Sequence, residues 1–118
     1  MIGIDLVAIS RIEKMMERFG NKALERFLSK DEIALVQKPS RAAGFWAAKE
    51  AASKALKTGI GKECSFHDII LTKASNGAPH ITFSQKIIDN FKISDASVSI
   101  THDNGMAIAV VAIEKQIK

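Results

Sequence analysis

The sequence predicts a single α+β domain in which a mainly antiparallel sheet packs on one long and several short helices. The 118 residues, 47% of them hydrophobic, are enough for one core and leave little room for a second. Helical patterns fill the first half of the chain, whereas alternating strand patterns follow from Ser65 onward. Because no repeat or linker separates the two halves, we expect them to form one domain over residues 1–118.

The amino-terminal segment predicts a strand followed by a helix. Residues 2–9 are β-branched and apolar, and they indicate a buried strand that one carboxylate, Asp5, interrupts. Ser10 and Glu13 have the spacing of a capping box, so a helix is expected over 11–19. One face of this helix carries basic side chains, here called the basic stripe: Arg11, Lys14 and Arg18.

Three more helices are expected before the strand-rich half of the chain. A short one covers 21–28, and Ser29 with Glu32 repeats the capping-box spacing ahead of another. The longest helical stretch, 41–57, is alanine-rich and is expected to end at Gly59. Polar and aromatic side chains share one of its faces: Trp46, Glu50, Ser53, Lys54 and Lys57.

The second half of the chain predicts two hairpins joined by a short helix. The expected segments are strands 68–73 and 80–83 around the turn 76–79, a helix over 85–91, and strands 97–102 and 106–113 around the turn 103–105.

Charge and composition narrow the function classes. The net charge of +4 comes entirely from residues 1–59, which hold eleven lysines and arginines against seven aspartates and glutamates. Such a surplus suits an acidic partner or an anionic ligand. Nucleic acid is disfavoured because the chain has no tyrosine, one tryptophan and no stacking aromatics beside the basic stripe. No apolar run approaches the roughly 20 residues that span a bilayer, so we expect a cytoplasmic protein that does not bind membranes.

Two carboxylates stand among residues that cannot solvate them, namely Asp5 in its apolar strand and Glu50 on the alanine-rich helix. A buried carboxylate needs a cation, a hydrogen-bond network or a metal. Oxygen ligands favour magnesium, which commonly binds one or two carboxylates together with substrate phosphates. Alternatively, Asp5 is a cap, and Glu50 pairs with Lys54 one helical turn away.

Two further features are compatible with phosphate binding. Glycines in the loop 58–62 leave its amides free to bind an anion, although the same residues fit an ordinary helix end with Gly59 as its cap. His102 ends a strand just before a turn, where it is either held by one hydrogen bond or able to reach a substrate.

Taken together, these segments resemble the holo-acyl-carrier-protein synthases, the small bacterial phosphopantetheinyl transferases. The resemblance covers nearly the whole chain. It rests on IGIDLVAISRI (2–12), RFLSKDE (26–32), WAAKEAASKALKTGIG (46–61), NGAP (76–79) and VSITHD (98–103). The most specific signatures are G-[IL]-D near the start and W/F-x-x-K-E-x-x-x-K on a helix.

The resemblance implies the phosphopantetheinyl transferase fold and a magnesium-dependent transfer of phosphopantetheine from coenzyme A to a serine of apo-acyl carrier protein, for fatty acid biosynthesis. It implies that Asp5 and Glu50 bind the metal and act in catalysis with Lys54. Lys54 also lies beside the coenzyme A phosphates in this assignment. The remaining coenzyme A contacts that it implies are Gly61, Asn76, Gly77, Pro79 and His102.

The resemblance also implies that the basic stripe docks an acidic helix of the carrier protein, and that the chain forms a homotrimer with active sites at subunit interfaces. Three positions depart from the family pattern. Lys57 replaces a usual glycine, Phe45 replaces a frequent arginine, and Ala78 replaces a usual lysine. The alternative function is a non-catalytic basic module that binds an acidic protein or nucleic acid, with Asp5 and Glu50 in structural ion pairs.

Overall fold

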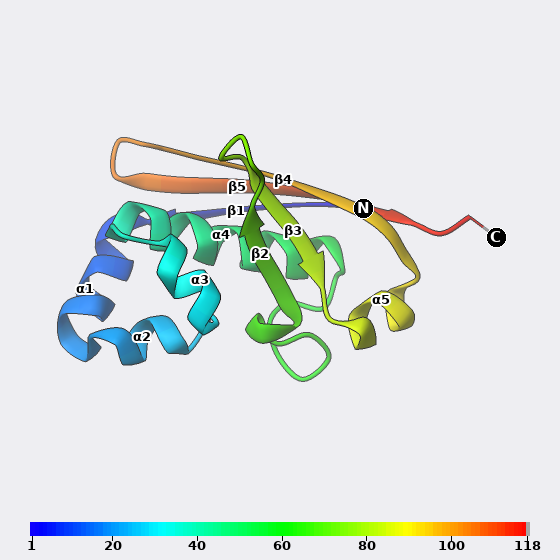
Figure 1. Cartoon of the computed structure of the whole chain (residues 1–118), viewed down its shortest axis with the longest axis horizontal. Coiled ribbons are helices and arrows are strands. Elements are labelled where there is room, and N and C mark those ends of the chain that lie inside the picture. The colour runs from blue at the N-terminus through cyan, green and yellow to red at the C-terminus, as the bar shows by residue number, and fades with distance from the viewer. Residues whose placement is uncertain (118) are drawn as a thin grey trace.

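A computed structural model, which describes residues 1–117, confirms the predicted α+β class (Figure 1). The strands are β1 (Ile2–Ala8), β2 (Ile69–Lys73), β3 (Pro79–Phe83), β4 (Ile93–Asp103) and β5 (Met106–Lys115). The helices are α1 (Ile9–Phe19), α2 (Asn21–Glu25), α3 (Lys30–Leu35), α4 (Pro39–Ala55) and α5 (Gln85–Phe91), with a 3₁₀ turn η1 at Phe66–Asp68. Within the described residues, no helix is both long and apolar enough to cross a membrane.

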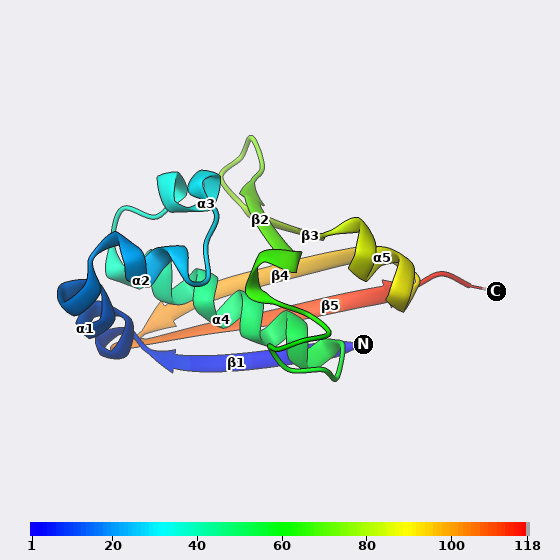
Figure 2. The same ribbon diagram turned by 90° about the horizontal axis from the view of Figure 1, so that it is seen from below.

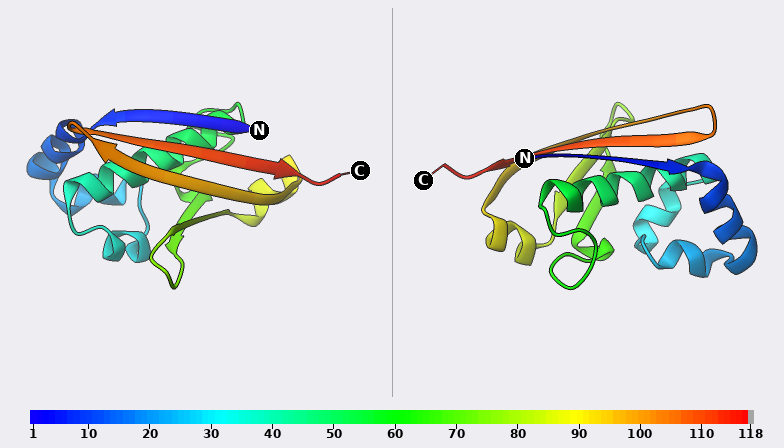
Figure 3. Two further views of the ribbon diagram at one scale, coloured as in Figure 1. Left: turned by 90° about the horizontal axis from the view of Figure 1, so that it is seen from above. Right: turned by 180° about the vertical axis from the view of Figure 1, so that it is seen from behind.

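The strands form two antiparallel sheets where the sequence analysis expected one. The larger sheet has the order β1-β5-β4, and β2 pairs only with β3. The hairpin β2-β3 lies against β4 without forming a ladder with it. All the helices lie on one side of the three-stranded sheet, and the hairpin runs from that side past the β4 edge (Figure 1, and Figure 3 from behind). No helix among residues 1–117 covers the other face of that sheet.

Helix α4 runs across the covered face of the large sheet (Figure 2). Its alanines explain the close approach, because Ala47, Ala48, Ala51 and Ala52 are fully buried. Gly3 of β1 lies directly beneath the helix: a Cβ there would overlap the Ala51 carbonyl oxygen and lie 2.6 Å from the Ala55 nitrogen. The predicted long, alanine-rich helix is therefore confirmed, and α4 fixes the position of β1.

The prediction that residues 2–9 form a buried strand is wrong for half of the side chains. Gly3 and Val7 are buried against α4, but Ile2, Ile4 and Leu6 are 75%, 59% and 57% exposed. A strand in a sheet covered on one face only should alternate polar and apolar residues. This strand carries apolar residues on its open face as well, which explains why the pattern indicated burial on both sides.

Four predicted helix ends differ from the structure: the starts of α1 and α4 and the ends of α2 and α4. The capping box at Ser10 does not form, because β1 leads directly into α1: Ala8 is the N-cap, and the Ile9 amide donates to the Gly105 carbonyl at 2.8 Å. Ser10 therefore lies inside the helix. The second predicted box, between Ser29 and Glu32, is confirmed at the start of α3.

The long helix α4 also ends earlier than predicted. Its last residue is Ala55, and Lys57 adopts a left-handed conformation with φ 66°. Gly59 is left-handed as well, and the amides of Thr58 and Gly59 both donate to the Ser53 carbonyl. Lys57 replaces a usual family glycine, and it does so at a position where the left-handed backbone favours glycine.

Candidate active site

Asp5, Glu50 and Lys54 meet at the β1 edge of the large sheet, here called the carboxylate edge. Asp5 points toward α4 from the covered face of β1, and the Lys54 ammonium donates to its Oδ1 at 2.8 Å and to the Ile4 carbonyl at 3.3 Å. Asp5 is 13% exposed in this ion pair and Lys54 is 53% exposed. Lys54 therefore pairs with Asp5 and not with Glu50, its neighbour one turn away on α4.

The Glu50 carboxylate accepts no hydrogen bond and forms no ion pair with any group in residues 1–117. Burial raises its pKa, and the negative charge of Asp5 raises it further, while Lys54 and Arg11 act in the opposite direction. Lys54, one turn after Glu50 on α4, contacts Asp5 at 2.8 Å, so both carboxylates lie at the same edge of the molecule. Glu50 is thus a half-buried carboxylate without an ion-pair partner among residues 1–117.

This geometry fits a magnesium ion. Within residues 1–117 no cluster of three or more acidic, histidine or cysteine side chains could form a metal cage. Magnesium does not require one, because it retains several waters and takes its other ligands from substrate phosphates. Asp5 and Lys54 line a surface hollow of about 360 Å³ at this edge, and Glu50 precedes Lys54 by one turn of α4. Bound there, the ion would relieve the repulsion between the two carboxylates.

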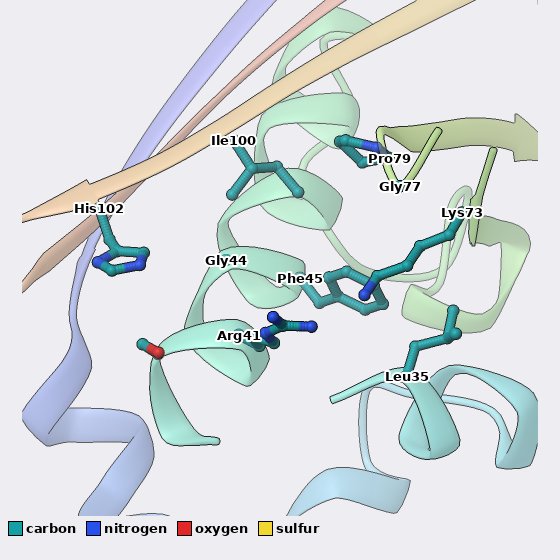
Figure 4. Close-up of a pocket in the computed structure, with 10 residues that line it drawn as sticks. Leu35, Arg41, Gly44, Phe45, Lys73, Gly77, Pro79, Ile100 and His102 are labelled. Atoms are coloured by element: carbon teal, nitrogen blue, oxygen red, sulfur yellow. The ribbon is translucent and has the colours of Figure 1, made fainter. Parts of the chain in front are cut away.

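A second site, here called the cationic pocket, lies on the other side of α4 (Figure 4). Its volume is about 260 Å³, and none of its lining residues is acidic. Arg41 from α4 and Lys73 from β2 both point into the space beside the Phe45 ring, and His102 lies at one end. The residues that line the pocket are Leu35, Ser40, Arg41, Gly44, Phe45, Lys73, Gly77, Pro79, Ile100 and His102.

The cationic pocket includes only some of the residues predicted to bind coenzyme A. Gly77, Pro79 and His102 line it, whereas Asn76 uses its Oδ1 to accept the Ala78 amide and so shapes the turn. Gly61 lines neither this pocket nor the hollow at the carboxylate edge. Its amide donates to the Cys64 carbonyl at 2.9 Å, so the predicted use of loop amides for an anion would require a different amide.

Sequence reasoning missed Arg41 and Lys73. Neither stands in a recognisable pattern, since Arg41 opens an alanine-rich helix and Lys73 ends an ordinary strand. The folded chain brings them together with His102, which comes 61 positions after Arg41 in the sequence.

The basic stripe lies on exposed positions of α1, as predicted. Arg18 stacks over the Phe19 ring at 5.2 Å, and Arg11 stacks over the Trp46 ring at 5.1 Å. Trp46 and Glu50 are one turn apart on α4, so the stripe begins beside the carboxylate edge. A partner that binds the stripe would therefore lie next to Glu50.

Beneath both sites lies a buried ion pair that the sequence analysis did not predict. The Lys49 ammonium, fully buried, donates to Glu32 Oε1 at 2.7 Å and to the carbonyls of Phe27 and Phe66. Glu32 accepts the Leu71 amide as well. Burial lowers the pKa of Lys49, while Glu32 opposes this shift. These hydrogen bonds join α4 to α3, η1 and β2, and so fix the helix that carries Glu50.

The carboxylate edge and the cationic pocket are separated by α4 itself. Arg41 precedes Glu50 by nine residues, or about two and a half helical turns, so the two project from opposite sides of α4. Asp5, Ala109 and Ile100 form one row across β1, β5 and β4, with α4 seated on the central strand. The two sites therefore lie at opposite edges of the sheet in one chain.

Comparisons with known proteins agree on one family. A family model described as the 4'-phosphopantetheinyl transferase superfamily matches residues 1–111. The chain is 62% identical to the holo-[acyl-carrier-protein] synthase of Sulfurimonas denitrificans over 97% of its length and 94% of that protein. It is 58% identical to the Wolinella succinogenes enzyme of the same name, over 98% of both.

A solved structure shows the same fold. The crystal structure of Helicobacter pylori holo-[acyl-carrier-protein] synthase in complex with coenzyme A superposes with a TM-score of 0.94 and is 56% identical. The match covers 97% of this chain and 100% of that one.

Proposed function

The chain belongs to the holo-[acyl-carrier-protein] synthases of the 4'-phosphopantetheinyl transferase superfamily, and from this we propose that it transfers phosphopantetheine from coenzyme A to a serine of apo-acyl carrier protein. The observation that carries the proposal is the group formed by Asp5, Glu50 and Lys54, in which Lys54 contacts Asp5 and follows Glu50 by one helical turn. Membership in a family of enzymes also argues against the non-catalytic basic module. We place the reaction in the cytoplasm, where it supplies holo-carrier protein for fatty acid biosynthesis.

In the proposed reaction the serine oxygen forms a bond to the phosphorus that carries the pantetheine arm. The bond from that phosphorus to the bridging oxygen of the pyrophosphate breaks, and adenosine 3',5'-bisphosphate leaves with the electron pair. Asp5 and Glu50 would hold Mg²⁺, which would neutralise the pyrophosphate charge. Lys54 can turn from Asp5 toward the leaving phosphate, because its half-exposed side chain is held there by only two contacts.

We assign the nucleotide end of coenzyme A to the cationic pocket. Arg41, Lys73 and His102 offer donors for its 3'-phosphate. In this chain the position of the frequent family arginine is Phe45, and Arg41 brings a guanidinium into the same pocket from one turn earlier on α4. The turn that holds Asn76, Gly77 and Pro79 would border the adenine. The space in front of Gly61 is open, since a Cβ built on this residue would meet nothing within 4 Å. Because Gly61 has no side chain, a phosphate could approach its backbone closely.

One coenzyme A molecule that used both sites would have to contact two copies of the chain. The carboxylate edge and the cationic pocket lie on opposite sides of α4, so a neighbour must bring its pocket to this chain's carboxylates. The exposed apolar residues Ile2, Ile4, Leu6 and Val110 provide a surface for such assembly. A head-to-tail arrangement that closes on itself gives a ring, and we propose the homotrimer that the family resemblance implies.

The carrier protein would dock on the basic stripe of α1. Arg11, Lys14 and Arg18 would pair with acidic side chains of a carrier helix. Since Arg11 is next to Trp46 and Trp46 is one turn from Glu50, a carrier bound there would present its serine near the carboxylate edge.

The proposal is tested by the intact mass of an apo-acyl carrier protein after incubation with this protein, coenzyme A and magnesium. We expect the carrier to gain the mass of one phosphopantetheine, and a chelator to abolish the gain. Asp5→Ala and Glu50→Ala should abolish it too, whereas Asp89→Ala, which removes an exposed carboxylate on α5, should not. No gain with any of several carrier proteins, or an undiminished gain with both alanine variants, would refute the proposal.

A further inference from the structure

Arg11 differs from the other two members of the basic stripe in what lies beneath it. Its guanidinium carbon is 5.1 Å from the centre of the Trp46 ring. That ring is itself held, because it packs at 5.1 Å edge-on against Phe27 and at 5.0 Å against Phe66. Phe27 is fully buried. The ring under Arg11 is therefore a fixed platform that extends from the core to the surface.

The platform also determines where the charge of Arg11 lies. Trp46 and Glu50 are four residues apart on α4 and share one face of that helix. The guanidinium stacked on the Trp46 ring therefore lies on the side of α4 that carries Glu50. Within residues 1–117 Arg11 forms no salt bridge, so its donors are available to a second protein.

We propose that Trp46 is a positioning residue for the partner protein: its ring holds the Arg11 guanidinium beside the carboxylate edge, ready to bind a carboxylate on a helix of the acyl carrier protein. The inference rests on the proposed function and adds to it how the docking site is aligned with the reaction site. A stacked guanidinium loses less freedom on binding than a mobile one, and its planar fork suits a carboxylate.

The chain contains a matched comparison at the other end of the basic stripe. Arg18 and Arg26 stack over Phe19 at 5.2 and 5.8 Å, but the Phe19 ring is 47% exposed and packs on no other ring among the described residues. Phe19 is therefore a loose support. Removing it should matter less than removing the Trp46 ring.

The test is steady-state kinetics with the carrier protein and coenzyme A varied separately. We expect Trp46→Leu to raise the KM for the carrier about 3- to 10-fold while the KM for coenzyme A changes less than about 2-fold. Trp46→Phe, which keeps an aromatic face, should restore most of the loss. Phe19→Leu should leave the carrier KM within about 2-fold of the wild type.

A double-mutant cycle separates positioning from packing. If the ring acts through Arg11, adding Trp46→Leu to Arg11→Ala should not raise the carrier KM further. The proposal is overturned if Trp46→Leu keeps its full effect in that background, if the KM values for both substrates rise together, or if Phe19→Leu has an equal effect. A wild-type protein that modifies no carrier at all would instead refute the proposed function.

Because Trp46 is the only tryptophan and the chain has no tyrosine, its fluorescence gives a second readout without turnover. Adding a tryptophan-free apo-carrier protein should change the emission of the wild type and leave that of Arg11→Ala nearly unchanged. An equal change in both proteins would contradict the link between the ring and the docked carrier.

Discussion

At the scale of single residues, Asp68 connects three segments of the chain. Its Oδ2 accepts hydrogen bonds from the backbone amide and the hydroxyl of Ser65 and is 3.3 Å from the Lys86 ammonium, and its Oδ1 accepts the Ser84 hydroxyl at 2.8 Å. Partial burial disfavours the charge of Asp68, but the bonds from Ser65, Ser84 and Lys86 outweigh this effect and lower its pKa to about 2. The ionised carboxylate thus ties the loop after α4 to the start of α5.

Replacing Asp68 by asparagine should therefore reduce stability in a pH-dependent way. Because the folded-state pKa of about 2 lies below the usual 3.8, the stabilisation is complete above pH 3.8 and disappears as the pH falls toward 2. We expect Asp68→Asn to lower the free energy of unfolding by about 1–2 kcal/mol at pH 7. Urea denaturation of both proteins at several pH values measures the difference.

The difference between wild type and Asp68→Asn should shrink between about pH 4 and pH 2. Asp103→Asn, a change at an exposed carboxylate in the β4-β5 turn, is the matched control and should show no such trend. A constant difference across the pH range would show that Asp68 stabilises by shape and not by charge.

Some site residues could be predicted from sequence for a physical reason. Asp5 and Glu50 stand out because a carboxylate among apolar residues needs a partner, and the structure does bring them together. The roles of Arg41 and Lys49 could not be predicted from sequence. Both are basic residues in an alanine-rich helix, and the sequence around them does not show which one is exposed and which one is buried. Only the folded chain reveals that one faces a pocket and the other faces Glu32.

At the scale of secondary-structure elements, the hairpins and helices were predictable, and their ends were less so. The turn between β4 and β5 has positive φ at both Asn104 and Gly105, the conformation that an Asn-Gly turn favours. The end of α4 was not predictable, because Lys57 takes the left-handed position that the sequence pattern assigned to Gly59. The open face of β1 was not predictable either, since nothing in one chain shows what covers an apolar strand.

The contact between β1 and α4 gives a prediction for a single methyl group. Gly3→Ala would place a Cβ against the backbone of Ala51 and Ala55. Relieving this overlap would require the β1 or α4 backbone to move. We expect a loss of at least about 2 kcal/mol in the free energy of unfolding. Transfer activity should fall as well, because β1 carries Asp5 two residues further on.

Chemical denaturation and the transfer assay check this prediction. Gly61→Ala is the matched control for stability, since a Cβ at Gly61 meets nothing within 4 Å, and it should change the free energy of unfolding by less than about 0.5 kcal/mol. If Gly3→Ala were as stable as the wild type, β1 and α4 would not be packed as described.

At the scale of the whole molecule, the uncovered face of the large sheet is the feature to test first. Leu6 lies on this face and is 57% exposed. If the face is buried between subunits, Leu6→Asp should convert a trimer into a monomer in sedimentation velocity, because burying an unpaired carboxylate is costly. Ile70→Asp, a change at an exposed apolar residue of β2, should leave the sedimentation unchanged. A wild type that sediments as a monomer would contradict the assembly.

In the proposed assembly, each reaction site combines the carboxylate edge of one subunit with the cationic pocket of the next. We therefore co-express Asp5→Ala with the double variant Arg41→Ala/His102→Ala and measure transfer by the mass gain of the carrier protein. Each variant alone should be nearly inactive. The mixed assembly should recover about a quarter of the wild-type rate if subunits associate at random. Co-expressed Asp5→Ala and Glu50→Ala, which damage the same edge, should stay inactive, and mixed assemblies of the first pair that showed no recovery would contradict the claim.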